Sequence, residues 1–370
     1  MVKNGMSKYF YGLVMVSLFF SCKPARFTLY PIQDNTFHLL GRAIYDGANG
    51  IRLISSASGI AFDFEGDSCI VNFRNLTSEN NHGYAVIELD GAYYGRYRID
   101  NAFSQPLSIQ AKDRVTIHHV QAIKATEAQN GDISILNVSA RKVKAASTRR
   151  SGRIEFIGNS ITCGMGNDIS VIPCGQGQWY DQHNAYNSYA TITARALNLE
   201  PMLSAVSGIG IYRCWNVDCP AMPDVYESLH LGADSTHQWD FNQWTPDIVS
   251  IALGTNDFSD GDGVHERKPF DAAIFVQRYL SFIQTIYRHY PKVQIILLTS
   301  PMLNGDKSTE LYKLINSIAD HINALKINRP SIKTFQFAPM HATGCSGHPN
   351  KAEHQVMADQ LIPFIKTFIK

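Results

Sequence analysis

The spacing of apolar residues changes near residue 150, and this change constrains the fold of the chain more than any other feature. Upstream, short segments such as residues 68–73 and 84–89 are rich in β-branched and aromatic residues. Downstream, short apolar runs such as residues 248–253 alternate with long amphipathic segments such as residues 270–290. The two patterns are typical of different architectures. We therefore expect one domain at residues 27–145 and a second at residues 151–370.

The first pattern indicates an all-β domain. Strand-like segments recur about every ten residues, without a long helical pattern between them. Asp90-Gly91 separates two of these segments and is a strong signal for a two-residue hairpin. We expect an antiparallel β-sandwich of the jelly-roll type. The basic stretch at residues 142–150 is interpreted as a linker.

The second pattern indicates an α/β domain. Apolar runs favour strands at residues 154–157, 202–206, 248–253, 293–298 and 332–337. Helical spacing favours helices at residues 185–197, 270–290, 309–325 and 351–370. Alternation of this kind predicts a parallel sheet covered by helices on both faces.

Four short polar segments follow the predicted parallel strands. They contain Ser160, Gly208, Asn256 and His348, in that order along the chain. Ligands of an open α/β sheet bind outside the carboxyl ends of its strands, so these four residues are expected at one edge. The sequence therefore places its candidate chemistry at this edge.

The four residues form a chemically coherent set. Ser160 needs a base to act as a nucleophile, and His348 can serve as that base. The backbone N–H groups of Ser160 and Gly208 and the side-chain amide of Asn256 can stabilise a developing oxyanion. Glycine at position 208 also permits a close approach of substrate to the backbone. We predict acyl transfer through Ser160 and His348.

The blocks Gly-Asn-Ser, Ser-Gly, Gly-Thr-Asn-Asp and Gly-His resemble those of SGNH (GDSL-type) hydrolases. With the β-rich segment in front, residues 30–370 resemble carbohydrate esterase family 2, the acetyl-xylan esterase-like deacetylases. The resemblance implies a three-layer domain with a flavodoxin-like parallel sheet. It also implies that Ser160 is the nucleophile, His348 the base, and Gly208 with Asn256 the oxyanion donors.

The implied activity is removal of O-acetyl groups from acetylated xylan or glucomannan, through an acyl-enzyme and without a metal or cofactor. The partner would be an acetylated polysaccharide or oligosaccharide. Two alternatives remain open. One is a carbohydrate-binding lipoprotein without catalysis, and the other is an SGNH lipase or thioesterase.

One departure from the family pattern concerns the group that orients His348. Many relatives carry an aspartate two or three residues before this histidine, where the present chain has Ser346 and Cys345. Either His348 donates its second N–H to a backbone carbonyl, or a distant acid such as Asp257 accepts it. Some members of carbohydrate esterase family 2 are known as dyads, so the resemblance favours a Ser–His dyad here. The carboxylate is the least indispensable member of a triad, so its absence need not abolish activity.

Aromatic residues near the predicted edge are candidates for stacking on sugar rings. All four tryptophans lie between the Ser160 block and the Asn256 block. Aromatic faces in such loops can bind sugars. We select Trp215 and Trp239 as the substrate-binding candidates.

The N-terminus and the cysteines indicate export. Two lysines precede an apolar stretch at residues 9–20, followed by Ser21 and Cys22, which fits a lipoprotein-type signal peptide over residues 1–21. Lipid attachment at Cys22 would leave six of the seven cysteines and place the protein in the periplasm or on the outer membrane of a Gram-negative bacterium. There, disulfides Cys214–Cys219 and Cys163–Cys174 are plausible.

The charge balance argues against nucleic-acid binding, and the spacing of possible metal ligands argues against metal binding. The chain carries 33 basic and 32 acidic side chains, for a formal charge of +1. This balance argues against binding to nucleic acid. Cys345, His348 and His354 lack a second ligand pair at finger-like spacing, so we expect no metal site.

Overall fold

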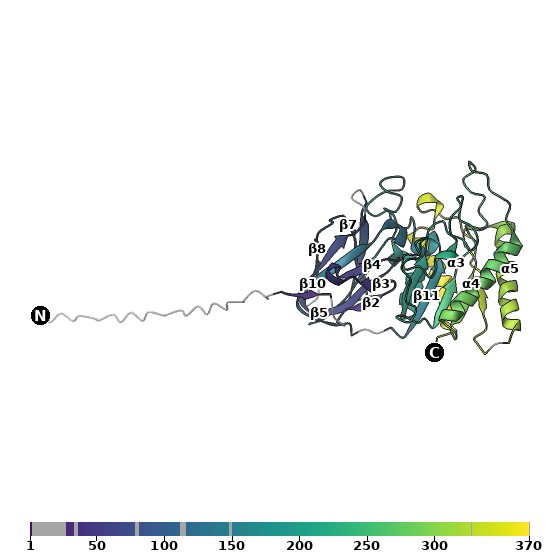
Figure 1. The fold of residues 1–370 in the computed structure, drawn as a ribbon. Coiled ribbons are helices and arrows are strands. Elements are labelled where there is room, and N and C mark those ends of the chain that lie inside the picture. The colour runs from purple at the N-terminus through teal and green to yellow at the C-terminus, as the bar shows by residue number, and fades with distance from the viewer. Residues whose placement is uncertain are drawn as a thin grey trace.

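The computed structural model describes residues 1, 27–32, 36–77, 81–111, 116–147, 150–326 and 328–369. The expected signal peptide, apart from its first residue, and Cys22 lie outside these residues and stay predictions. Figure 1 shows two domains side by side, with the purple and blue strands of the first domain next to β11. In the described part of the chain, no helix combines the length and the apolar character needed to cross a bilayer.

The first domain is an antiparallel sheet region of ten strands, as expected. The strands are β1 (Thr28–Pro31), β2 (His38–Leu40), β3 (Ala43–Tyr45), β4 (Ile51–Leu53), β5 (Gly59–Asn75), β6 (Gly83–Leu89), β7 (Ala92–Ile99), β8 (Gln105–Gln110), β9 (Ile117–Lys124) and β10 (Ile133–Ala145). Two short 3-10 helices interrupt them, η1 (Gly47–Asn49) and η2 (Ala128–Asn130).

The long strand β5 organises this domain, because it pairs with β2, β8, β9 and β10. The sequence pattern favours a strand at residues 68–73, whereas the structure extends this strand back to Gly59. Asp90 and Gly91 turn the chain from β6 into β7 with φ values of 52° and 78°. Positive φ at both positions is what a type I′ hairpin requires, and the predicted hairpin is confirmed.

The expected linker begins later than the sequence suggested. Residues 142–145 belong to β10, where they pair with residues 62–65 of β5. The basic composition reflects an exposed strand end: Lys144 Nζ lies 2.5 Å from the carboxylate of Glu65.

The second domain is a parallel sheet with helices, as expected. Its strands are β11 (Gly152–Gly158), β12 (Leu199–Ala205), β13 (Ile248–Ile251), β14 (Gln294–Leu298) and β15 (Lys333–Phe335). Its helices are α1 (Ser160–Cys163), η3 (Ala185–Asn187), α2 (Tyr189–Ala196), α3 (Met222–Val225), α4 (Ala272–His289), α5 (Gly305–Ala324), η4 (Cys345–Gly347) and α6 (Lys351–Lys366). The order β12-β11-β13-β14-β15 is the flavodoxin-like arrangement.

Alternation along the strands divides the core between the two faces of this sheet. Ile295 and Leu297 of β14 join one cluster with α4 and α5, while Ile296 and Leu298 join another with α2 and α6. Successive side chains of a strand point to opposite faces, so apolar residues throughout β14 require a cover on both sides. The second cluster also contains Leu40, Val86 and Ile123 of the first domain. The two domains therefore share a core.

Candidate active site

Ser160 lies in a tight turn at the carboxyl end of β11. Asn159 caps α1 by accepting the Ile161 N–H at 3.2 Å, which makes Ser160 the first residue of the helix. A Cβ at position 158 would come within 2.1 Å of Thr162 Oγ1, so the turn requires Gly158. As a first helical residue, Ser160 has a backbone N–H without a partner inside the helix. Ser160 is 6% exposed.

The structure brings His348 to Ser160. His348 Nε2 lies 2.7 Å from Ser160 Oγ, although 188 residues separate the two in sequence. Burial lowers the pKa of His348 from its ordinary value of 6.5, and the hydrogen bond to the Ser346 carbonyl partly opposes this shift. A lower pKa keeps the imidazole neutral near pH 7, which is the form that can take a proton from a hydroxyl.

The second ring nitrogen of His348 faces the backbone. Nδ1 lies 3.0 Å from the carbonyl oxygen of Ser346, to which the Nδ1–H tautomer donates. Ser346 has a positive φ of 55°, and this backbone conformation directs its carbonyl to the ring. Asp257 is occupied elsewhere, because its buried carboxylate accepts the N–H groups of Ile211 and Tyr212 at 2.9 and 3.0 Å. The geometry is that of a Ser–His dyad.

A disulfide between Cys174 and Cys345 ties down the loop that carries His348. Our pairing of Cys163 with Cys174 is wrong, because Cys163 is buried on α1 and its thiol lies 3.6 Å from Glu127 Oε2. The local disulfide Cys214–Cys219 is confirmed. Among the described cysteines, Cys69 is the other one that is free and buried.

Gly208 and Asn256 lie at the ends of β12 and β13, beside Ser160. Gly208 has a φ of 77°, a conformation that favours glycine, and nothing lies within 4 Å of a Cβ built on it. Asn256 Nδ2 donates one hydrogen to the Ile209 carbonyl at 2.7 Å, which leaves the second amide hydrogen for a ligand. Both residues line the same cavity as Ser160 and His348.

This catalytic cavity has a volume of about 870 Å³. Trp179 and Trp215 line it with side chains that are 49% and 45% exposed. Gln129 reaches the cavity from η2 of the first domain. Large exposed aromatic rings beside amide and hydroxyl groups are the surface that sugars need. The placement of Trp215 agrees with its selection as a substrate-binding candidate.

The expectation for Trp239 is wrong. Its side chain is 4% exposed and belongs to the core, where the Arg42 guanidinium lies 5.5 Å from its ring. Arg42 belongs to the first domain, so this contact crosses between the two domains. Trp179 lines the cavity, and Trp239 does not. Trp179 is the first tryptophan after the Ser160 block, and this proximity is the signal that the sequence offers.

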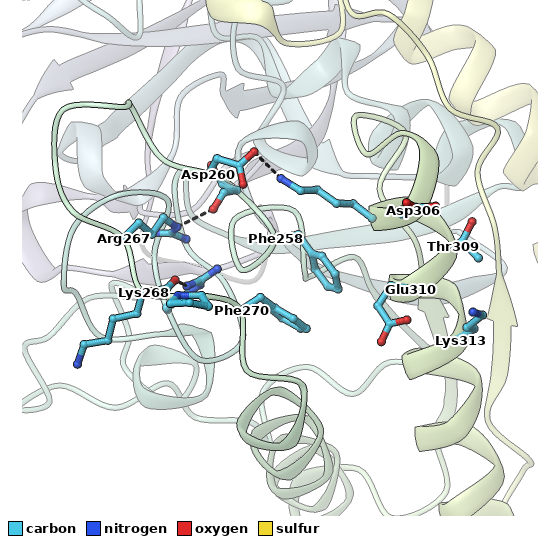
Figure 2. A pocket seen from close by; sticks show the side chains of 13 residues that line it. Phe258, Asp260, Arg267, Lys268, Phe270, Asp306, Thr309, Glu310 and Lys313 are labelled. Carbon is cyan, nitrogen blue, oxygen red and sulfur yellow. Dashed lines mark hydrogen bonds and ion pairs between the residues drawn. The ribbon is translucent and has the colours of Figure 1, made fainter.

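A second cavity of about 580 Å³ adjoins the catalytic cavity. Phe258 and Phe270 lie on one side of it, and Asp306, Glu310 and Lys313 lie on α5 opposite (Figure 2). The ion pair of Asp260 with Lys307, at 2.5 Å, is part of the lining of both cavities.

Side chains of this second cavity also support the Asn256 segment. The Arg267 guanidinium donates to the carbonyls of Asn256 and Ser259 at 2.5 and 2.6 Å. These bonds fix the backbone that carries the amide of Asn256. Among the described residues, no group of three His, Cys, Asp or Glu side chains is arranged to hold a metal ion.

Two family models match the chain. The GDSL-like Lipase/Acylhydrolase family matches residues 156–356, and the Carbohydrate esterase 2 N-terminal model matches residues 39–147. These matches confirm both family resemblances that the sequence indicated. They also confirm, at the level of the family, that the protein is an esterase.

Curated relatives agree with these models. The chain is 28% identical over 255 residues to an acetylxylan esterase / glucomannan deacetylase of Cellvibrio japonicus, an alignment that covers 67% of this chain and 66% of the relative. It is 30% identical over 345 residues to the cellulase/esterase CelE of Acetivibrio thermocellus, covering 91% of this chain and 40% of the relative. The chain thus matches less than two thirds of either relative.

A solved structure covers both domains. It is a family two carbohydrate esterase from Clostridium thermocellum in complex with cellohexaose, with a TM-score of 0.77 and 28% identity. The match covers 90% of this chain and 98% of that chain.

Proposed function

We propose a function for this chain from its family, because it belongs to the GDSL-like Lipase/Acylhydrolase family and carries a carbohydrate esterase 2 N-terminal domain. The proposed activity is the removal of O-acetyl groups from plant-type polysaccharides or oligosaccharides. Acetylated xylan and glucomannan are the proposed substrates. The names of the Cellvibrio japonicus relative support this choice. The observation that carries the proposal is the 2.7 Å contact of Ser160 Oγ with His348 Nε2 in the wall of an open cavity.

The proposed reaction proceeds through an acyl-enzyme. Ser160 Oγ attacks the acetyl carbonyl while His348 Nε2 accepts the hydroxyl proton. The oxyanion is stabilised by the N–H groups of Ser160 and Gly208 and by the free amide hydrogen of Asn256. His348 gives this proton to the departing sugar oxygen. It then takes a proton from the water that attacks the acyl-enzyme and passes it to Ser160 Oγ as acetate leaves.

The proposal extends to the aromatic residues that line the cavity. Trp179 and Trp215 would hold sugar rings at the cavity wall, and Gln129 offers an amide to sugar hydroxyls. A lipase or thioesterase would instead need a long apolar groove. The mixture of polar and aromatic lining residues favours a glycan.

The test is the Ser160→Ala variant. We expect it to lose about 10⁴-fold or more in acetate release from acetylated xylan, because no other group replaces the nucleophile. Acetate released from acetylated xylan and glucomannan is measured beside hydrolysis of short-chain and long-chain nitrophenyl esters.

Three results would contradict the proposal. Wild-type turnover by the Ser160→Ala protein would show that Ser160 is not the nucleophile. A wild-type protein that binds xylan and releases no acetate is a binding module. A preference for long-chain esters over acetylated glycans indicates a lipase.

A further inference from the structure

Glu127 belongs to the first domain, and its carboxylate is buried against the α/β domain. It precedes η2, in the connection between β9 and β10. Its relative exposure is 0%, and burial raises its pKa. An acidic side chain is rarely buried to this extent unless its oxygens are bonded.

Both carboxylate oxygens of Glu127 are bonded to Ser207. Oε2 accepts the Ser207 backbone N–H at 2.6 Å, and Oε1 accepts the Ser207 hydroxyl at 2.6 Å. Ser207 is the residue directly before Gly208. The thiol of Cys163 on α1, three residues after Ser160, lies 3.6 Å from Oε2. One carboxylate from the first domain therefore contacts the Ser-Gly block and the far end of α1, the helix that begins at Ser160.

These contacts hold one side of the peptide that carries the Gly208 N–H. On the other side, the Gly208 carbonyl accepts the Trp215 N–H at 2.8 Å. Glycine at a positive φ has wide conformational freedom, so the direction of its N–H depends on such constraints. Glu127 is itself fixed, because the buried Lys124 ammonium donates to its backbone carbonyl at 2.8 Å.

We propose that Glu127 is a positioning residue for catalysis, which holds the Ser207–Gly208 turn so that the Gly208 N–H faces the oxyanion. The inference rests on the proposed esterase function. It gives the first domain a part in the reaction that acts through the Gly208 N–H. Preorganised donors stabilise a transition state because they need no reorientation when charge develops.

The test compares Glu127→Gln with Glu155→Gln. Glu155 is a matched control, because it is equally buried and accepts two hydroxyl donors, Ser204 at 2.6 Å and Tyr226 at 2.9 Å. It does not line the catalytic cavity. Glutamine keeps the shape of glutamate but is neutral, so the Ser207 N–H loses a charge-assisted hydrogen bond even when the Ser207 hydroxyl turns to accept from the new NH₂ group.

For Glu127→Gln we expect kcat for nitrophenyl acetate to fall by about 10-fold to 100-fold with KM nearly unchanged, since the lost interaction acts on the transition state. For Glu155→Gln we expect a loss of thermal stability without this fall in kcat. Hydrogen exchange read by mass spectrometry should accelerate across residues 207–215 in Glu127→Gln alone.

Equal kcat in the two variants overturns the inference, as does unchanged exchange at residues 207–215. A wild-type protein that hydrolyses no acyl ester overturns the proposed function instead. In that case the exchange comparison still decides whether Glu127 holds the turn.

Discussion

At the scale of residues, the site depends on single backbone groups as much as on side chains. His348 is oriented by the carbonyl of Ser346, and the donors proposed for the oxyanion include two backbone N–H groups. The carboxylates near the site serve a different purpose. Asp257 holds the backbone N–H groups of residues 211–213, and Glu127 holds Ser207. These two carboxylates hold loop backbone, whereas a backbone carbonyl orients His348.

The pH dependence of the reaction follows from the burial of His348. Only neutral imidazole accepts the Ser160 proton, so kcat/KM rises as His348 loses its proton with increasing pH. Because burial lowers the pKa of His348 below 6.5, we expect the midpoint of this rise below pH 6.5. The measurement is kcat/KM for nitrophenyl acetate from about pH 4 to 8.

Ser346→Ala is the matched variant for this profile. The acceptor for Nδ1–H is a backbone carbonyl, which alanine retains, so the midpoint and most of the activity should persist. A midpoint at or above pH 6.5 in the wild-type protein contradicts the role of His348 burial. A large loss in Ser346→Ala contradicts the backbone dyad.

At the scale of elements, the catalytic edge is assembled from strand ends and one tethered loop. Ser160, Gly208 and Asn256 come within five residues of the ends of β11, β12 and β13, so the sheet positions them. His348 follows β15 at a distance of 13 residues, and η4 alone offers little rigidity there. The Cys174–Cys345 disulfide supplies the constraint three residues before His348.

Replacing Cys174 and Cys345 by serine should therefore weaken both stability and catalysis. A disulfide of this kind typically contributes about 2–4 kcal/mol to the free energy of unfolding, and more for long loops such as this separation of 171 residues. Freeing the loop displaces His348, and a displacement of about 1 Å can cost about 100-fold in rate. Urea unfolding and kcat on nitrophenyl acetate are measured together.

The control is the Cys214→Ser, Cys219→Ser pair, whose disulfide closes a separation of only 5 residues. Its loss of unfolding free energy should be clearly smaller. A Cys174→Ser, Cys345→Ser protein with wild-type kcat would show that the loop is held in place without the disulfide.

The sequence predicted the features that depend on neighbouring residues. Ser160, Gly208 and Asn256 each follow an apolar run within a few residues, so strand prediction alone placed them at one edge. His348 was identified by its Gly-His block. A backbone partner for its second ring nitrogen was favoured because positions 345 and 346 carry no acidic residue and because the resembled family contains dyads. The partner of Cys345 was not predictable, because 171 residues separate it from Cys174 and spacing favours near pairs.

Features that depend on packing between domains were missed. Trp239 lies among loop residues in sequence, but it packs into the apolar cluster with α4 and α5, where Arg42 from the first domain also lies 5.5 Å from its ring centroid. Glu127 and Gln129 precede an ordinary Asn-Gly turn, so nothing in their local sequence separates them from a solvated loop. Their role is visible only after the two domains are packed together.

At the scale of the whole molecule, the two domains form one structural unit around shared apolar and polar contacts. Residues of β2, β6 and β9 enter the same cluster as residues of α2 and α6. Arg42, between β2 and β3, is fully buried and donates to the carbonyls of Ser228 and Tyr226 at 2.7 and 2.8 Å. We therefore expect the α/β domain to depend on the β domain for its stability. It also depends on the β domain for the Glu127 carboxylate that bonds Ser207.

Arg42→Met tests this dependence, because all four tryptophans lie in the α/β domain and report its unfolding. Methionine leaves two buried carbonyls unbonded and removes the positive charge near Glu155, so we expect a loss of about 3–5 kcal/mol. Tryptophan fluorescence and circular dichroism should still give one coincident transition in urea. The control Arg98→Met removes an exposed ion pair with Asp100 inside the β domain and should cost about 0–1 kcal/mol. An unchanged fluorescence transition in Arg42→Met would show that the α/β domain is stable independently of the β domain.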